Sequence, residues 1–388
     1  MTELSDRAKA SRVERVARVR RRMEELDVDV LLLSLGADLP WLTGYQAMPL
    51  ERLTMLVLPV SGDPVLVVPG LEAPRVARAD EVFAVRPWSD TEDPVAIVAS
   101  MVDAHVDRHR GASSLRVGVS DRTWATSVLA LQSAIPEAEW ITGSRVTSPI
   151  RAVKDDFELE ALRSASSAAD RVAAGLQRGD VSLIGRSEAE VSNDIGAWLV
   201  AEGHERVNFA IVGSGPNAAS PHHEAGSRII GPGETVVCDF GGTFSLEGEV
   251  GYCSDITRTV VTGEPTAEVA ECYEVLLAAQ QAAVAAAGDG IAAEAVDGVA
   301  RSIIEDAGYG DLFIHRTGHG IGIEEHEDPY LVAGNHELLR PGHAFSVEPG
   351  IYAPGRFGMR LEDIVIINGQ GASESLNTVS HRLAVIEG

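Results

Sequence analysis

The sequence is poor in cysteine and in lysine. Its three cysteines, Cys238, Cys253 and Cys272, show none of the regular spacings of a disulfide or zinc framework. We read all three as small buried hydrophobes, with Cys272 on the apolar stripe of a helix. The only lysines are Lys9 and Lys154, and arginine supplies the remaining basic charge. The cysteine usage is compatible with a reducing compartment and predicts a cytoplasmic protein.

Long uncharged apolar runs are also missing. No segment reaches the roughly 20 residues that a membrane-spanning helix needs, and the first residues, MTELSDRAKA, lack the apolar stretch of a secretory signal peptide. Basic charge is outnumbered, 32 lysines and arginines against 58 acidic residues, so the net charge is −26. Such a surface disfavours nucleic acid and anionic membranes as partners.

A length of 388 residues predicts two domains. In the first, over residues 1–150, an amphipathic helix is expected at 11–27, with Val13, Val16, Met23 and Leu26 on its apolar face. Apolar runs bounded by turn residues then predict strands. They are VDVLLLS, TMLVLPV, GDPVLVVP, VFAVRPW and RVGVS. Strands alternating with helices indicate an α/β domain.

The stretch SPIRAVKDD marks the start of the second domain, residues 151–388. Pro149 interrupts the preceding element, and Asp155 or Asp156 can begin a new helix. That helix has an apolar stripe formed by Leu159, Leu162, Ala165, Val172 and Leu176. Further helices are expected at 187–202, from Pro265 and Thr266 onward, and at 292–307.

Five short motifs in this second domain carry side chains of the kinds that bind metal ions. They are Asp239 in VVCDFGG, Asp255 in GYCSDITRT, His319 in RTGHGIG, Glu348 in SVEPGIY and Glu362 in MRLEDIV. Strand alternation places each carboxylate on a definite face, so four strands of one sheet can direct four carboxylates to one point. The glycines around His319 predict a loop that brings in the imidazole.

Four carboxylates at one point repel one another, and only cations make the cluster tolerable. One divalent ion needs fewer anionic ligands, so the count favours two ions bridged by carboxylates, as in hydrolytic two-metal sites. The imidazole favours Mn²⁺, Co²⁺ or Zn²⁺ over Mg²⁺ or Ca²⁺. Any one of these residues alone is more often structural, and the inference rests on the set.

Taken in order, DFGG, SDITRT, GHGIG, EPGIY and RLED resemble the pita-bread metallopeptidases, and specifically the Xaa-Pro aminopeptidase and Xaa-Pro dipeptidase (prolidase) branch. The resemblance extends over nearly the whole chain. It implies a creatinase-like α/β amino-terminal domain followed by a catalytic domain with a curved antiparallel sheet, an α/β (α+β) architecture. WLTGY at 41–45 resembles a tract of that first domain. The tract TFSLEGEVGYC before Asp255 is longer than the usual hairpin and predicts an enlarged turn.

The resemblance implies a manganese-dependent exopeptidase, with Co²⁺ or Zn²⁺ as alternatives, that hydrolyses the Xaa-Pro bond by attack of a metal-bridging hydroxide. Glu348 is the expected general base as well as a ligand. His222 and His326 are expected to contact the substrate and stabilise the transition state. His315 and Arg360 match positions near the proline pocket. The expected partners are a small peptide and a second copy of the chain.

Other interpretations stay open. The chain could cleave a non-proline peptide or another small molecule on the same fold, or it could be a non-catalytic binding protein, although such relatives typically lose ligands. Aminopeptidase and dipeptidase action are not distinguished by the motifs. The remaining histidines are expected at the surface or in packing positions: His105, His109, His204, His336, His343 and His381.

Overall fold

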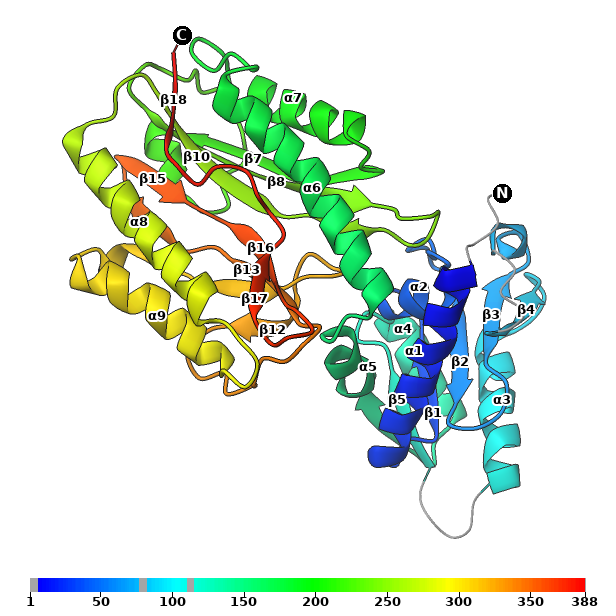
Figure 1. Ribbon diagram of the computed structural model, residues 1–388. Helices are drawn as coiled ribbons and strands as arrows, with labels where there is room; N and C mark the ends of the chain where they lie inside the picture. The colour runs from blue at the N-terminus through cyan, green and yellow to red at the C-terminus, as the bar shows by residue number, and fades with distance from the viewer. Residues whose placement is uncertain (1–5, 77–81, 110–114, 388) are drawn as a thin grey trace. The chain divides into compact units, whose positions relative to one another are not determined.

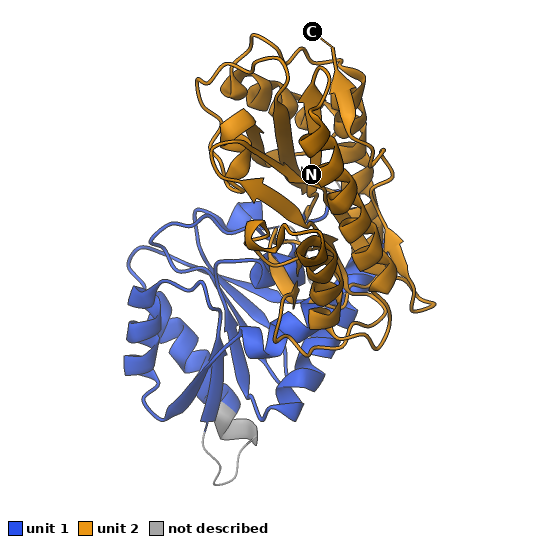
Figure 2. Ribbon diagram, turned by 90° about the vertical axis from the view of Figure 1, so that its left-hand side faces the viewer, with its two compact units in different colours: residues 1–151, 247–250 blue, residues 152–246, 251–388 orange. Residues whose placement is uncertain are grey.

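A computed structural model describes residues 6–76, 82–109 and 115–387, and the side chain of His109 lies outside the description. The chain divides into two compact units (Figure 2). The first comprises Met1–Arg151 with Glu247–Val250, and the second comprises Ala152–Leu246 with Gly251–Gly388. Among the helices described, none has the length and apolar character needed to cross a membrane.

The first unit is built on a six-stranded mixed sheet, with strands in the order β4-β3-β2-β1-β5-β6. β1 pairs antiparallel with β2 and parallel with β5. The strands are β1 (Val30–Leu33), β2 (Met55–Pro59), β3 (Val65–Pro69), β4 (Ala84–Trp88), β5 (Leu115–Val119) and β6 (Ala138–Thr142). The five apolar runs of the sequence therefore form β1 to β5, as predicted.

Helices accompany this sheet. They are α1 (Asp6–Glu25), α2 (Asp38–Thr43), α3 (Pro94–His109), α4 (Ala125–Ala134) and α5 (Ser144–Arg151), with a short 3₁₀ turn at Ala73–Arg75. The apolar face expected for the first helix was partly wrong. Val16, Val19 and Met23 are buried, but Val13 is 47% exposed. The buried face continues toward the amino terminus through Arg12 and Arg15, whose charged ends bond to protein groups.

The enlarged turn expected before Asp255 is present. β8 (Thr235–Phe244) and β9 (Tyr252–Cys253) pair directly, which leaves residues 245–251 as their connection. Glu247 and Gly248 both have positive φ, 54° and 76°, so the chain turns sharply there. Residues 247–250 belong to the first unit, where the buried Glu249 carboxylate accepts a hydrogen bond of 3.0 Å from Arg12 Nε.

The second unit contains two five-stranded sheets and a hairpin. One sheet has the order β18-β10-β8-β7 with β9 on β8, the other has the order β12-β11-β13-β16-β17, and β14 pairs with β15. The pairings are antiparallel except that of β10 with β18. The remaining strands are β7 (Arg206–Ser214), β10 (Ile256–Thr262), β11 (Gly318–Gly320), β12 (Glu327–Leu331), β13 (Ala344–Val347), β14 (Gly350–Ala353), β15 (Phe357–Arg360), β16 (Asp363–Ile367), β17 (Ser373–Ser375) and β18 (Ala384–Ile386).

A pair of helices covers each sheet of the second unit (Figure 1). α6 (Asp156–Arg178) and α7 (Glu188–Ala201) pack on the β7–β8–β10 side. α8 (Ala267–Ala286) and α9 (Ala293–Asp306) run beside each other against β13 and β16. Asp155 begins α6 with a reciprocal capping box to Glu158, and Thr266 caps α8. Short 3₁₀ turns lie at Gly215–Ala219 and Gly310–Leu312.

Among the histidines expected at the surface or in packing positions, His343 lies in a packing position. Its side chain is fully buried, and its ring nitrogens have no hydrogen-bond partner among the residues described. Burial, together with the nearby charges of Lys154 and Arg340, lowers its pKa from 6.5 to about 3. The folded protein therefore holds His343 neutral at a pH where the unfolded chain binds a proton.

Replacing His343 by leucine is expected to make the protein less sensitive to acid. Because the pKa is lower in the folded state, the contribution of His343 to stability falls as the pH drops below 6.5, by about 2 kcal/mol at pH 5. His343→Leu removes that loss, which urea unfolding at pH 7 and pH 5 measures. His336→Leu, at a largely exposed position, is the control. Equal acid sensitivity in wild type and His343→Leu would contradict the expectation.

Candidate functional site

Two of the five motif residues come from the first sheet of the second unit. Asp239 lies within β8, and Asp255 lies immediately before β10. The antiparallel pairing of these strands sets Asp239 opposite Thr257. Alternation also turns Cys238 to the other face, where it packs in the apolar core. Both carboxylates are buried, at 7% and 4% exposure.

Two further residues come from the ends of neighbouring strands in the second sheet. Glu348 follows β13 and Glu362 precedes β16, and the register of these strands pairs Val347 with Asp363. Thr257 joins the two sheets at this point. Its hydroxyl donates to Glu362 Oε2 at 2.6 Å, and its carbonyl accepts from the Glu362 amide at 3.2 Å.

His319 lies in the short strand β11, so the loop predicted for it was wrong. The glycines do not loosen the chain here but allow other backbone to approach closely. A Cβ on Gly318 would lie 1.9 Å from the Ser346 carbonyl oxygen, and one on Gly320 would lie 2.1 Å from that of Asp328. Glycine is therefore required on both sides of the imidazole for β11 to pair with its neighbours.

The five side chains converge. His319 Nε2 lies 3.2 Å from Glu348 Oε1 and 3.7 Å from Asp255 Oδ2. Asp255, His319 and Glu362 each offer a ligand atom within 4.8 Å of the others. Asp239 Oδ1 is buried and, within the part of the chain described, has no hydrogen-bond partner. A buried anionic oxygen without a donor is costly, so this donor set fits a divalent cation.

The electrostatics of the group support the same conclusion. Burial, followed by repulsion from the other carboxylates, raises the pKa of Asp255 and Glu362 well above their ordinary values. Burial also raises the pKa of Asp239. Burial opposes the ionisation of Glu348 too, but the hydrogen bond and charge of His319 outweigh it and lower that pKa to about 2. All four carboxylates stay ionised together only when cations compensate them.

The group lies in a cavity of about 760 Å³. The cavity wall also includes the four residues predicted to contact the substrate, which are His222, His315, His326 and Arg360. His326 packs against His319 with ring centroids 4.1 Å apart. Burial and the charges of His319 and Arg316 lower the pKa of His326 to about 4. By contrast, His223 bonds to Glu188 at 2.8 Å and serves the packing around α7.

Tyr352 links the predicted residues and was missed by sequence reasoning. Its hydroxyl lies 2.9 Å from His315 Nε2 and accepts a 2.8 Å hydrogen bond from Arg360 Nη1. Arg360 also donates to Asp239 Oδ2 and to Thr257 Oγ1. The tyrosine stands at the end of the EPGIY motif, two residues from the start of β14, so the signal was present.

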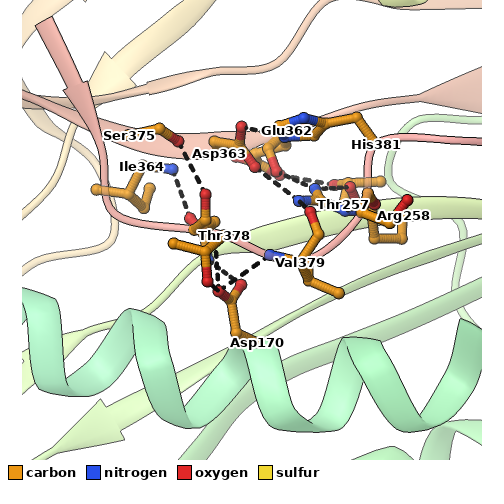
Figure 3. Close-up of polar contacts among 12 residues, drawn as sticks. Asp170, Thr257, Arg258, Glu362, Asp363, Ile364, Ser375, Thr378, Val379 and His381 are labelled. Carbon is orange, nitrogen blue, oxygen red and sulfur yellow. Dashed lines mark hydrogen bonds and ion pairs between the residues drawn. The ribbon is translucent and has the colours of Figure 1, made fainter.

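A second buried polar network holds the backbone beside Glu362, one of the five motif residues (Figure 3). Arg258 is fully buried and pairs with Asp363 Oδ1 at 2.8 Å. Its Nη1 also donates to the carbonyl oxygens of Thr257, at 2.9 Å, and Glu362, at 2.6 Å. His381 and Gln280 bond to the other Asp363 oxygen. Arg258 thus fixes the position of the Glu362 backbone, and with it the position of the Glu362 side chain.

The carboxyl-terminal segment is held by Asp170 of α6, which Figure 3 shows beneath residues 378 and 379. Asp170 accepts hydrogen bonds from Asn377 Nδ2 and Thr378 Oγ1, both at 3.0 Å, and from the Val379 amide at 3.3 Å. This segment then supplies carbonyl oxygens to Arg258. The helix, the terminal segment and the metal-type ligands are therefore connected through buried hydrogen bonds.

Comparisons with known proteins agree with this geometry. The model of metallopeptidase family M24 matches residues 160–369, and that of the creatinase/prolidase N-terminal domain matches residues 15–153. The chain is 43% identical over 359 residues to a probable dipeptidase PepE of Mycobacterium tuberculosis, covering 92% of each chain. It is 35% identical to an Xaa-Pro dipeptidase of Lactobacillus delbrueckii subsp. lactis, covering 90% of this chain and 93% of that one. The crystal structure of dipeptidase PepE from Mycobacterium ulcerans superposes with a TM-score of 0.89 at 41% identity, covering 100% of both chains. The chain therefore belongs to metallopeptidase family M24, with a creatinase/prolidase N-terminal domain and a pita-bread catalytic domain.

Proposed function

We propose that the protein is an exopeptidase that hydrolyses the Xaa-Pro bond of dipeptides or of short peptides, with two divalent ions as cofactor. The observation that carries the proposal is the convergence of the five motif side chains at one wall of a cavity of about 760 Å³. That wall also presents the neutral histidine His326, and a cavity of this size holds a small peptide.

The ions would be held by Asp239, Asp255, His319, Glu348 and Glu362, and Mn²⁺ is the ion proposed. Bound divalent ions supply Lewis acidity and lower the pKa of a water molecule toward neutrality. The carboxylates also suit the free amino group of a peptide, which is cationic at neutral pH. This attraction favours cleavage next to the amino terminus, which is exopeptidase action.

Glu348 would accept and return the proton. Its Oε1 lies 3.1 Å from Ser346 Oγ and 3.2 Å from His319 Nε2, and these contacts keep the carboxylate ionised at pH 7, the form that a proton acceptor needs. His326 is neutral at pH 7 and can donate from one ring nitrogen to the carbonyl oxygen, together with His222. The proline nitrogen carries no hydrogen in the peptide, so the proton held by Glu348 is needed as it leaves.

Two classes of substrate deserve comparison. A relative named Xaa-Pro dipeptidase supports proline specificity, whereas the more similar PepE relative is named only as a probable dipeptidase. Ala-Pro and Met-Pro are therefore assayed beside Ala-Leu and Ala-Ala, each with Mn²⁺, Co²⁺ or Zn²⁺ added. We expect the proline dipeptides to have a kcat/KM at least about tenfold higher, a difference of about 1.4 kcal/mol in transition-state binding.

Removal of metal is expected to abolish turnover. Dialysis against EDTA should lower kcat by more than about 10³-fold, and added Mn²⁺ should restore it. Elemental analysis before and after dialysis gives the number of ions per chain. Undiminished hydrolysis by protein shown to be free of metal would overturn the proposal, and equal rates on Ala-Pro and Ala-Leu would limit it to a general dipeptidase.

A further inference from the structure

Arg316 is a cationic side chain in the cavity wall whose role is not explained by the metal centre. It stands three residues before His319, and its guanidinium carbon lies 4.5 Å from the ring centroid of Tyr330. Within the described ranges, its guanidinium makes no hydrogen bond and has no carboxylate within ion-pair distance. The ring holds the charge in place but leaves its five donors unused.

The other charges of the cavity make Arg316 exceptional. Arg360 is already committed, because it donates to Asp239, Thr257 and Tyr352. The anionic groups of the wall are the four carboxylates of the metal centre and Glu325. Among the described wall residues, Arg316 is therefore the cation available to an anionic group of a ligand.

The location of Arg316 places this cation beside the reaction centre. It lines the same cavity as His319 and as His326, whose ring packs on His319. The cavity wall also includes the apolar side chains of Phe209, Ile211 and Ile314, and Ile314 is 64% exposed. An arginine fixed on an aromatic ring suits the planar, bidentate recognition of a carboxylate.

We propose that Arg316 binds a carboxylate of the substrate peptide. This inference rests on the proposed peptidase function and adds a determinant of specificity to it. Two carboxylates are chemically equivalent here: the free carboxyl terminus of a dipeptide and the side chain of an acidic amino-terminal residue. In the first case Arg316 selects dipeptides over longer chains, and in the second it selects Asp-Pro and Glu-Pro.

The test compares charged peptides with neutral analogues of nearly the same shape. Ala-Pro is paired with Ala-Pro amide, and Glu-Pro with Gln-Pro, in the wild type, Arg316→Gln and Arg316→Lys. We expect Arg316→Gln to raise KM about 10- to 100-fold for one charged member and to change its neutral analogue less than about threefold. Arg316→Lys should recover part of the loss because it retains the charge. Arg340→Gln, at a largely exposed arginine that is not among the residues lining the cavity, is the matched control.

The two pairs identify the source of the carboxylate. A selective effect on Ala-Pro identifies the carboxyl terminus, and a selective effect on Glu-Pro identifies the acidic side chain. Equal losses on both members of each pair, or no loss on any, would overturn the role of Arg316. Thermal melting of each variant separates these results from misfolding.

Failure of the proposed function gives a different pattern. If the wild type cleaves Ala-Leu as well as Ala-Pro, proline specificity is lost, and Ala-Leu with its amide then tests Arg316 in the same way. If no peptide is cleaved, calorimetric titration of Ala-Pro, Ala-Pro amide, Glu-Pro and Gln-Pro into the Mn²⁺-loaded wild type and Arg316→Gln provides the readout. Equal binding within both pairs, or equal binding of every peptide by wild type and variant, overturns the role of Arg316.

Discussion

Asparagine in place of Asp255 is expected to remove both metal and activity while leaving a folded and, without metal, more stable protein. The substitution keeps the shape of the side chain but removes its charge from a group in which Asp255 lies 3.7 Å from His319 Nε2. We expect kcat/KM to fall by at least about 10³-fold, a loss of about 4 kcal/mol in transition-state stabilisation. Elemental analysis should find fewer ions per chain than in the wild type.

The stability of the EDTA-treated protein gives an independent measure of the repulsion between Asp255 and the other buried carboxylates. The pKa of Asp255 is raised in the folded state, so its contribution to stability is present below its unfolded pKa and is lost as the pH rises. Asp255→Asn should therefore be more stable than the wild type at pH 8, by about 1–3 kcal/mol, and the difference should shrink toward pH 5. Asp306→Asn, at an exposed position of α9, is the control. Full metal content and turnover in Asp255→Asn would remove this residue from the centre.

The largest loss of stability is expected from Arg258. Methionine at this position leaves the Asp363 carboxylate buried without its partner and deprives five backbone and side-chain acceptors of a donor. Breaking one side of a buried ion pair costs about 3–5 kcal/mol. We expect urea unfolding of the metal-free protein to show a decrease of that size. Metal affinity should fall as well, because the Glu362 backbone loses its anchor.

A double variant separates the buried charge from the lost packing. Arg258→Met with Asp363→Asn no longer leaves a buried carboxylate without its arginine, so it should recover part of the stability that Arg258→Met loses. Arg163→Met is the matched control, because Arg163 pairs with Glu374 where both side chains are exposed, and we expect a change of no more than about 0.5 kcal/mol there. A decrease below 1 kcal/mol for Arg258→Met would show that the network does not support the fold.

The parts of the molecule that could be predicted are those with a local cause. Asp155 begins α6 because its side chain caps the helix, and that pattern is visible within four residues. Asp239 faces the cavity because strand alternation determines its side of β8. The resemblance of the five ordered motifs to the family predicts that these five residues act as one set. In the structure all five line one cavity. Their individual roles stay predictions until the variants are measured.

The parts that could not be predicted depend on contacts between distant segments. Asp170 and Thr378 are 208 positions apart, and nothing in either neighbourhood indicates that they meet. Glycines usually mark turns, so the sequence predicts a loop at His319, but here the close approach of Ser346 and Asp328 requires the glycines. Arg316 could not be singled out, because its significance lies in having no acidic partner among the described residues, which only the surrounding side chains reveal.

The connection between β8 and β9 limits how the gene can be divided. A recombinant fragment that stops at Arg151 encodes Arg12, which is 2% exposed, without the Glu249 that pairs with it. In the intact chain the Thr43 carbonyl is the other acceptor of this guanidinium, so the fragment loses the carboxylate that compensates the Arg12 charge, and breaking one side of a buried ion pair costs about 3–5 kcal/mol. Expression of the first unit by itself therefore calls for a neutral residue in place of Arg12. When this unit is exchanged between relatives, residues 247–250 must be exchanged together with it.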